Sequence, residues 1–339
     1  MFKLSDVRHP RPSLKSFLWG SLGGSAGVLA AVIGVGVYIV ENIIRPKRLA
    51  TFALYTFSPY ELGLPAEDVT FPSLHEDHQV NGWYIPYPDA KTTIIVSPGY
   101  RSSKTDVLGL CALLWKAGHN VLVFEYYGHG TVVGMPVTLG YHEINDFLGA
   151  VTYAQKRDPD AHLGAVGYSM GAAVSIMGTA RTPAIEALVA DSAFATHRRV
   201  VEYAVRRTLH LPFIIFDWVT DLLLWLRAGY HFNQVEPLRD IERIAPRPVL
   251  IIHGMKDSVV DPHDAPLLYK AAGEPKELWL LQDVEHCGAY FADRAAYMHK
   301  VIEFFDLYLK QLPPVAADTQ AEQATDPSDG DEQQLSEAS

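Results

Sequence analysis

The chain has 339 residues, of which 48% are hydrophobic and 20% charged, enough to build one large α/β domain or two small ones. The formal net charge is −11, and no basic surface is indicated, which argues against a nucleic-acid partner. Two cysteines, Cys111 and Cys287, are too few to suggest a disulfide framework or a zinc site.

The N-terminal region contains a run of 24 uncharged residues from Phe17 to Val40. About 20 apolar residues span a bilayer, whereas the apolar part of a signal peptide has about 7–15 and precedes a small-residue cleavage site. The sequence that follows, "ENIIRPKR", has no such site. We therefore predict an uncleaved single-pass anchor within residues 1–45. The alternative is a buried helix of a soluble core, but the six glycines of the run would weaken it, whereas spanning helices tolerate glycine.

Basic residues flank this run almost equally. Four lie between residues 3 and 15, and three lie between residues 45 and 48. Positive charge is retained on the cytoplasmic side of a membrane. The small excess favours a cytoplasmic N-terminus, with the large domain on the extracytoplasmic side.

Residues 46–312 are predicted to form one domain. Residues 69–87 alternate apolar and polar side chains, which indicates short antiparallel strands. After them, short apolar runs alternate with helical patterns, and the predicted strands lie in "TTIIVSPG", "NVLVFEYYGHG", "HLGAVGYS", "ALVADSAF", "RPVLIIHGMKD" and "KELWLLQDVEHCG". Such alternation is typical of a mostly parallel sheet with helices on both faces.

One segment, at about residues 195–236, has no strand signal and is long, helical and strongly apolar. Asp217, Asp221 and Arg227 interrupt it, so a second spanning helix is not predicted. We expect a helical cap over the sheet; the alternative is a helix packed on the core. Residues 313–339 contain seven acidic residues, no Lys or Arg and no aromatic residue, which predicts a disordered acidic tail.

The stretch "GYSMG" places Ser169 between Gly167 and Gly171, after a predicted strand and before a predicted helix. This is the context of a Gly-x-Ser-x-Gly nucleophile elbow, in which the serine lies on a sharp, strained turn at the edge of a sheet. Side chains two residues to either side would collide with neighbouring elements, and glycine removes that collision. Ser169 is therefore the candidate nucleophile.

A serine hydroxyl needs a base to take its proton, and the elbow arrangement expects the chain order serine, acid, histidine. Asp257 in "HGMKDSVVDP" and His286 in "QDVEHCGAY" each follow an apolar strand in that order. Asp257 would orient the imidazole, and His286 would act as general base and then as general acid.

Other residues compete for these two roles. His129, in a glycine loop near the same edge, and His253, at the end of a strand, are the alternative histidines. Asp191 in "ADSAF" also ends a strand and is the main rival acid; Asp261 and Asp283 are weaker ones.

The oxyanion of a tetrahedral intermediate needs two hydrogen-bond donors. One is expected from the backbone N–H of Met170, the residue after the nucleophile, and the other from the loop after an early strand. In "IIVSPGYRSS", Pro98 has no N–H and Gly99 permits a close approach, so Tyr100 is the predicted second donor.

With these motifs the chain resembles an α/β-hydrolase, and within that superfamily it is similar to the Bem46/FrsA-like serine hydrolases, which often carry an N-terminal membrane anchor. The matching pieces follow one another from about residue 70 to residue 310: "VNGWYIP", "VSPGYRSSKTD", "AGHNVLVFEYYGHG", "LGYHEINDFLGAVTY", "VGYSMGAA", "LVADSAF", "PVLIIHGMKDSVV" and "EHCGAYFADRAAYMHKVIEFF". Two departures concern the pocket. Pro98-Gly99 stands where the family has His-Gly, and Glu125 and Tyr127 stand where many relatives have Asp and Arg.

The resemblance implies an α/β-hydrolase fold and hydrolysis of an ester, thioester or amide. We predict a membrane-anchored serine hydrolase acting on a carboxylic ester, and the anchor together with the apolar segment 211–229 favours a lipid or acyl substrate. The alternatives are a serine peptidase or amidase of the same fold, and a non-catalytic binding module at the membrane. No metal or cofactor is predicted, because the sequence has no spaced His/Asp cluster and "GYSMG" is not a phosphate loop.

Overall fold

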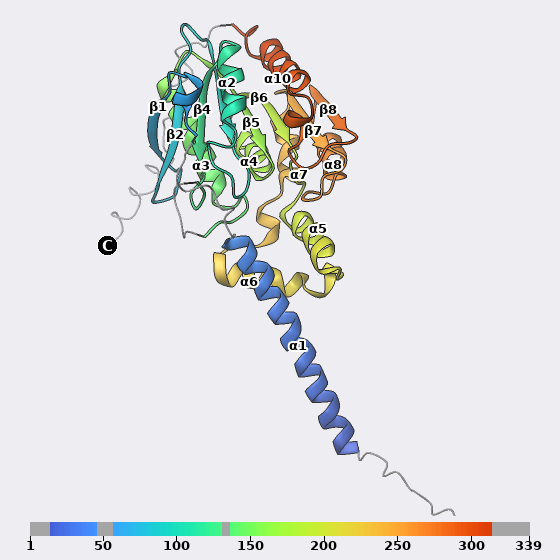
Figure 1. Ribbon diagram of the computed structural model, residues 1–339. Helices are drawn as coiled ribbons and strands as arrows, with labels where there is room; N and C mark the ends of the chain where they lie inside the picture. The colour runs from blue at the N-terminus through green and yellow to red at the C-terminus, as the bar shows by residue number, and fades with distance from the viewer. Residues whose placement is uncertain (1–13, 46–56, 131–135, 314–339) are drawn as a thin grey trace, which may run out of the picture.

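The computed structural model describes residues 14–45, 57–130 and 136–313. Its centre is a single eight-stranded sheet (Figure 1). The strands are β1 (Glu67–Pro72), β2 (Gln79–Ile85), β3 (Thr92–Ser97), β4 (Asn120–Glu125), β5 (His162–Tyr168), β6 (Ile185–Asp191), β7 (Val249–Gly254) and β8 (Lys276–Leu281).

The strand order across the sheet is β1-β2-β4-β3-β5-β6-β7-β8. β1 and β2 pair antiparallel, as the alternating pattern of residues 69–87 predicts, and β2 pairs antiparallel with β4. From β4 to β8 every neighbouring pair is parallel. The carboxyl ends of these strands therefore meet at one edge of the sheet. β5 lies between β3 and β6, and all seven of its residues are buried, as its continuous apolar sequence requires.

Helices cover both faces of the sheet. On one face, buried residues of α3, α4 and α8 pack on the strands; on the other, those of α2 and α10 do so. The helices are α1 (Leu14–Ile44), α2 (Leu108–Lys116), α3 (Glu143–Arg157), α4 (Met170–Thr179), α5 (His197–Leu209), α6 (Asp217–Ala228), α7 (Pro237–Asp240), α8 (Asp264–Ala271), α9 (Ala289–Ala292) and α10 (Arg294–Tyr308). Short 3₁₀ turns are η1 (Pro59–Leu62), η2 (Phe213–Ile215), η3 (Phe232–Gln234) and η4 (Ile241–Ile244). This is the α/β-hydrolase fold, and the predicted fold class is confirmed.

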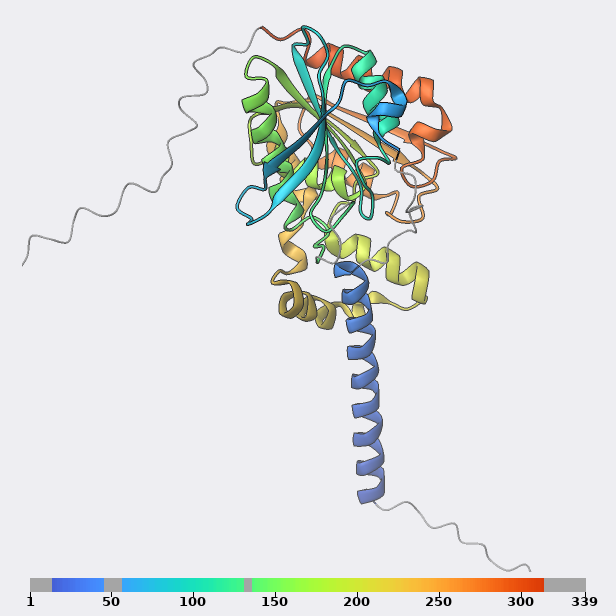
Figure 2. The same ribbon diagram turned by 60° about the vertical axis from the view of Figure 1, so that its left-hand side comes forward.

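The segment between β6 and β7 contains α5, η2 and α6 and projects beyond the sheet (Figures 1 and 2). In both views these elements gather around the upper end of α1, while most of α1 extends away from the domain. We call the region from residue 195 to residue 236 the cap. α1 holds the one segment in the described part of the chain that is long and apolar enough to cross a membrane, Gly27–Ile44.

Two predictions lie outside the described residues. The acidic tail falls there except for Pro313, and so do most of the basic residues that flank the N-terminal run.

Candidate active site

Ser169 lies in the turn between β5 and α4. Its φ is 53° and its ψ is −119°, a conformation that is strained for any residue other than glycine. A Cβ at Gly167 would lie 2.5 Å from the carbonyl oxygen of Gly171, and one at Gly171 would lie 2.3 Å from that of Pro98. Both positions therefore exclude a side chain. The two glycines are thus required by packing, as predicted from the sequence.

His286 lies in the loop after β8, at the same sheet edge as Ser169, and its side chain contacts Ser169. Its Nε2 is 2.8 Å from the Oγ of Ser169, and its Nδ1 is 2.6 Å from Oδ2 of Asp257. Both distances are those of strong hydrogen bonds. The structure thus brings together the three residues that the sequence places on three separate loops.

Asp257 lies after β7 and is almost completely buried. Its Oδ1 accepts the backbone N–H groups of Val259 and Val260 at 2.8 and 2.9 Å, and His253 Nε2 lies 3.1 Å from its Oδ2. Burial alone would raise the pKa of Asp257, but the adjacent side chains of His253 and His286 and the backbone N–H of Val260 lower this pKa well below its ordinary value. The carboxylate is therefore ionised at neutral pH, as an orienting acid requires.

The rival residues are engaged elsewhere. Asp191 is buried at the end of β6, where it accepts hydrogen bonds from Ser192 Oγ (2.9 Å) and Tyr297 Oη (3.0 Å) and makes none to His286 among the described residues. Its pKa is raised to about 6 by burial. His129 is buried, with Nδ1 3.2 Å from the carbonyl oxygen of Tyr127.

The two remaining acids form ion pairs at the surface with residues other than His286. Asp261 pairs with His263 at 2.8 Å, and Asp283 pairs with Lys256 at 2.9 Å. Neither competes with Asp257 for the imidazole.

The predicted oxyanion donors lie beside the elbow. A Cβ at Gly99 would be 3.4 Å from the Cβ of Ser169, so the loop after β3 packs directly on the turn. Tyr100 and Met170 both line a cavity together with Ser169. The backbone N–H groups of these two residues have no hydrogen-bond acceptor among the described residues, which leaves both able to donate to an oxyanion.

Ser169 lies where two cavities meet. One, of about 320 Å³, is lined mainly by apolar side chains, and in the described part of the chain no Lys, Arg, Asp or Glu lines it. The other, of about 640 Å³, lies on the side of His286 and includes Ser102, Asp106 and Arg294 with the aromatic rings of Tyr290 and Phe291. We call these the apolar cavity and the mixed cavity.

The apolar cavity lies between α5 and α1. Val200, Val201 and Val205 of α5 form one wall, and Ile39 and Ile43 of α1 form another. The Tyr100 hydroxyl donates to the carbonyl oxygens of Asn42 (2.8 Å) and Ile43 (2.9 Å), which ties the end of α1 to the loop beside Ser169. The N-terminal helix therefore contributes directly to the site.

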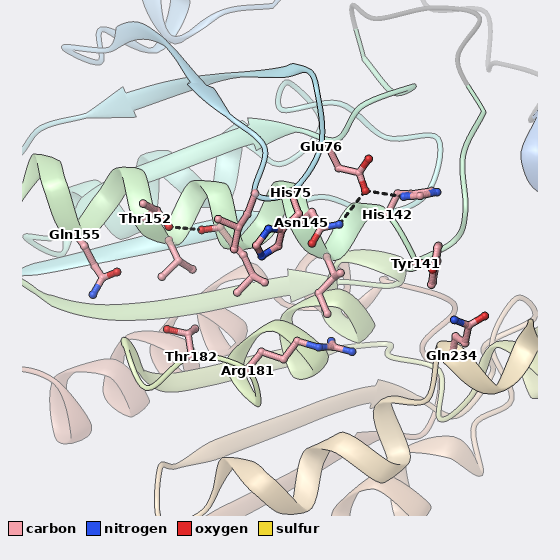
Figure 3. A pocket seen from close by; sticks show the side chains of 15 residues that line it. His75, Glu76, Tyr141, His142, Asn145, Thr152, Gln155, Arg181, Thr182 and Gln234 are labelled. Carbon is pink, nitrogen blue, oxygen red and sulfur yellow. Dashed lines mark hydrogen bonds and ion pairs between the residues drawn. The ribbon is translucent and has the colours of Figure 1, made fainter. Parts of the chain in front are cut away.

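A third, polar groove lies apart from Ser169 on the α3 side of the sheet (Figure 3). It has a volume of about 580 Å³, and Glu76 in its wall accepts hydrogen bonds from His142 and Asn145 at 2.7 and 2.9 Å. Because these polar groups satisfy one another and neither Ser169 nor His286 borders the groove, the chemistry at the elbow does not involve it.

The fold and the elbow define the chain as an α/β-hydrolase. Residues 135–312, more than half of the chain, match the prolyl oligopeptidase family. The chain therefore belongs to this family.

Individual proteins with similar sequences come from bacteria and plants. The uncharacterized protein YqkD of Bacillus subtilis is 28% identical over 232 residues, which cover 68% of this chain and 76% of YqkD. The α/β-hydrolase domain-containing protein WAV2 of Arabidopsis thaliana is 23% identical over 299 residues, covering 84% of this chain and 93% of that protein. The narrower resemblance to Bem46/FrsA-like hydrolases stays a prediction.

Two solved structures share the fold. The esterase Pf2001 of Pyrococcus furiosus is 24% identical, with a TM-score of 0.64, and the match covers 78% of this chain and 99% of that chain. The acylaminoacyl peptidase of Pyrococcus horikoshii is 16% identical, with a TM-score of 0.57, over 76% of this chain and 44% of that chain. At these identities the likeness is one of fold.

Two features of the site were not predicted from the sequence. His253 was considered only as a rival of His286, and its position at the end of a strand did not indicate that it lies against Asp257 beside His286. The α1 residues that line the apolar cavity gave no signal at all, because their apolar character is also what a membrane anchor requires. The segment 211–229, which we linked to the substrate, does not line the apolar cavity; within the cap, α5 does.

Proposed function

We propose that the chain is a serine hydrolase that cleaves a carboxylic ester with an apolar acyl group, through an acyl-enzyme on Ser169. The observation that carries the proposal is the continuous relay from Ser169 Oγ to His286 Nε2 (2.8 Å) and from His286 Nδ1 to Asp257 (2.6 Å). Membership of the prolyl oligopeptidase family supports a serine hydrolase in general. The ester preference is our own inference from the cavities.

In the first half of the reaction, Ser169 Oγ attacks the substrate carbonyl carbon while His286 Nε2 takes the serine proton. The new carbon–oxygen bond gives a tetrahedral oxyanion, which the N–H groups of Tyr100 and Met170 stabilise. When the intermediate collapses, the bond to the alcohol breaks, and the imidazolium returns its proton to the leaving oxygen. Asp257 holds His286 in the required tautomer throughout.

In the second half, a water molecule attacks the acyl-enzyme. His286 takes one water proton, the second tetrahedral intermediate collapses, and the proton passes to Ser169 Oγ as the carboxylic acid leaves. The chain then returns to its starting protonation state.

The two cavities at Ser169 suggest which part of the substrate lies where. The uncharged apolar cavity suits an acyl chain, whose burial contributes about 0.8 kcal/mol for each CH₂ group. The mixed cavity, with Asp106 and Arg294, suits the more polar alcohol part. The substrate would thus lie across Ser169, between α1 on one side and α9 on the other.

A second candidate function is hydrolysis of an amide, as in a peptidase. The family match favours it, and Arg294 in the mixed cavity offers a cation for a peptide carboxylate. A third reading, a non-catalytic binding module at the membrane, would leave the aligned relay without a role.

We also propose that α1 anchors the chain in a membrane, with the domain on the extracytoplasmic side. The length of the uncharged run from Phe17 to Val40 supports the anchor, and the part of α1 from Gly27 on is apolar enough to cross a membrane. A signal sequence is the alternative for an apolar helix in this position.

The test compares the detergent-solubilised full chain with its Ser169→Ala variant on p-nitrophenyl esters of graded acyl length and on matched p-nitroanilides. Loss of the nucleophile should lower kcat at least ~10³-fold. Ser175→Ala is the control, because the buried Ser175 hydroxyl on the same helix has no partner among the described residues. Faster turnover of anilides would favour the amidase, and a folded chain that neither turns over nor reacts with a fluorophosphonate probe would favour the binding module.

A further inference from the structure

The outer side of the cap exposes an unusual number of large apolar side chains. Ile214 is 81% exposed, Leu226 61% and Trp218 60%, although all three belong to a short segment of the chain. We call this group the cap surface, and its members are Leu211, Ile214, Ile215, Trp218, Leu222, Trp225 and Leu226. Contiguous exposed apolar patches on a folded domain mark sites that contact another protein or a membrane.

Helix α6 is amphipathic with its apolar face outward. Trp218, Leu222 and Trp225 follow one another at spacings of four and three residues, so they lie on one side of the helix. Thr220 and Leu224, on the other side, are buried. The exposed face is therefore a separate surface, and packing of the cap does not account for it.

The cap surface lies where α1 leaves the domain. A Cβ at Gly36 would be 2.7 Å from Cγ1 of Val219, and Arg227 of α6 pairs with Glu41 of α1. Both views show α6 running across α1 near its upper end rather than along it (Figures 1 and 2). If α1 crosses a bilayer, α6 lies close to the plane of that bilayer.

The length of α1 on the far side of Gly36 determines how deep α6 would lie in a bilayer that α1 crosses. The uncharged run reaches Gly36 after 19 residues, Phe17 to Val35, and at about 1.5 Å per residue these extend ~28 Å. The hydrocarbon core of a bilayer is about 30 Å thick. Contact between α6 and Gly36 therefore places α6 at the boundary between the acyl chains and the headgroups.

The acidic side chains of α6 interact with other groups of the domain. Asp217 pairs with Arg198, and Asp221 lies 2.9 Å from His231 and accepts the N–H of Phe232 at 2.8 Å. The tryptophans Trp218 and Trp225 remain on the outer face, and tryptophan is enriched at membrane interfaces. This division of charged and apolar groups is that of a helix lying in a membrane surface.

We propose that the cap surface is a second membrane contact, embedded in the interface of the bilayer that α1 crosses. The proposal rests on α1 being a membrane span, and it does not depend on catalysis at Ser169. It has a consequence for access, because Tyr38 of α1 and Leu209 of α5 line the apolar cavity next to this contact. An acyl chain leaving the bilayer would then reach Ser169 without crossing water.

The experiment places a nitroxide label at Leu222→Cys in the full chain, reconstituted in vesicles of phosphatidylcholine and phosphatidylglycerol. The matched control is Leu307→Cys on α10, because the two leucines are 42% and 46% exposed and α10 lies at the opposite end of the domain (Figure 1). The unsubstituted chain gives the labelling background of the two native cysteines. The Ser169→Ala background is used throughout, so that the result is independent of the proposed hydrolysis.

Collisions with oxygen, which concentrates in lipid, and with a water-soluble nickel chelate are measured by power saturation. We expect oxygen collisions to exceed nickel collisions several-fold at Leu222 and the reverse at Leu307. Equal nickel access at both positions would overturn the proposal, and so would a label at Leu222 that neither reagent reaches, since that indicates a protein partner or a second copy. Leu226→Cys gives an independent position if Leu222→Cys does not fold.

Discussion

The sheet edge and the cap are held by different forces. At the edge, Ser169, His286 and Asp257 are connected by hydrogen bonds of 2.6–2.8 Å, and Asp257 is fixed by two backbone N–H groups. The cap instead packs on α1 through apolar side chains such as Val219 and Leu223 against Gly36, beside one ion pair between Arg227 and Glu41. Hydrogen bonds need defined distances and angles, whereas apolar packing is non-directional.

Under the proposed function, this difference separates the chemical step at the sheet edge from the access of substrate through the cap. A change at the edge should alter the rate for every substrate, because it acts on the reacting groups. A change in the cap should alter stability or the supply of substrate and leave the chemistry intact. The predictions below test that separation, beginning with a substitution at the sheet edge that should lower the rate strongly.

Asp257→Asn should lower kcat by about 10⁴-fold, because an amide at this position no longer fixes the His286 tautomer that can accept the serine proton. The measurement is steady-state hydrolysis of a short p-nitrophenyl ester by the full chain. Asp283→Asn is the control, since Asp283 is exposed and pairs only with Lys256 at the surface. A loss of less than about tenfold would show that another acid orients His286, with Asp191 the first to examine.

Asp191→Asn should change the pH dependence of stability more than the rate. Burial raises the pKa of Asp191 to about 6, above the value of about 3.9 in an unfolded chain. The folded state therefore binds this proton more tightly than the unfolded state, so its contribution to stability is present below about pH 4 and is lost as pH rises through 6. The two pKa values differ by about two units, so this group contributes about 3 kcal/mol to the free energy of unfolding at low pH.

The asparagine variant lacks this titration. We expect the difference in Tm, wild type minus variant, to fall between pH 4 and pH 7 in detergent. A difference that is flat across that range would mean that Asp191 keeps an ordinary pKa in the folded chain.

The sequence predicted the sheet edge closely because local motifs carry its geometry. The glycines around Ser169 are required by contacts of 2.3–2.5 Å, and the order of Ser169, Asp257 and His286 follows the order of parallel strands. The features that could not be predicted are contacts between segments that lie far apart in the sequence. Nothing in the sequence indicates that α1 packs on α6 and lines a cavity together with α5, because the same apolar residues satisfy both a bilayer and a protein neighbour.

The cap was predicted as an apolar insertion, but its two sides were not distinguished. α5 lines the apolar cavity, whereas α6 and η2 expose the apolar residues of the cap surface. Amphipathic spacing alone cannot tell which face meets the core, since an apolar face suits either a core or a membrane surface. The position of α6 on α1 is what distinguishes a face that meets the core from a face that meets a membrane surface.

Gly36→Leu tests the packing of α6 on α1, and its expected effect on stability is smaller than the effects above. A side chain at Gly36 would begin 2.7 Å from Val219 Cγ1 and 3.2 Å from Leu223 Cδ1, so the Val219 and Leu223 side chains or α6 itself must shift. Overpacking of this kind costs about 2 kcal/mol, which we expect as a lower Tm of the detergent-solubilised full chain. Gly34→Leu is the matched control, because nothing lies within 4 Å of a Cβ built there.

Both substitutions raise helix propensity equally, so the difference between them isolates the contact with α6. The rate on an acetyl ester should be the same in both variants, because neither glycine lines the apolar or the mixed cavity. If Gly34→Leu lowers Tm as much as Gly36→Leu, α1 and α6 do not pack as described, and the depth assigned to the cap surface falls with that contact. If only Gly36→Leu lowers Tm and the rate is unchanged, the cap is held on α1 while the proposed chemistry at the sheet edge does not depend on that contact.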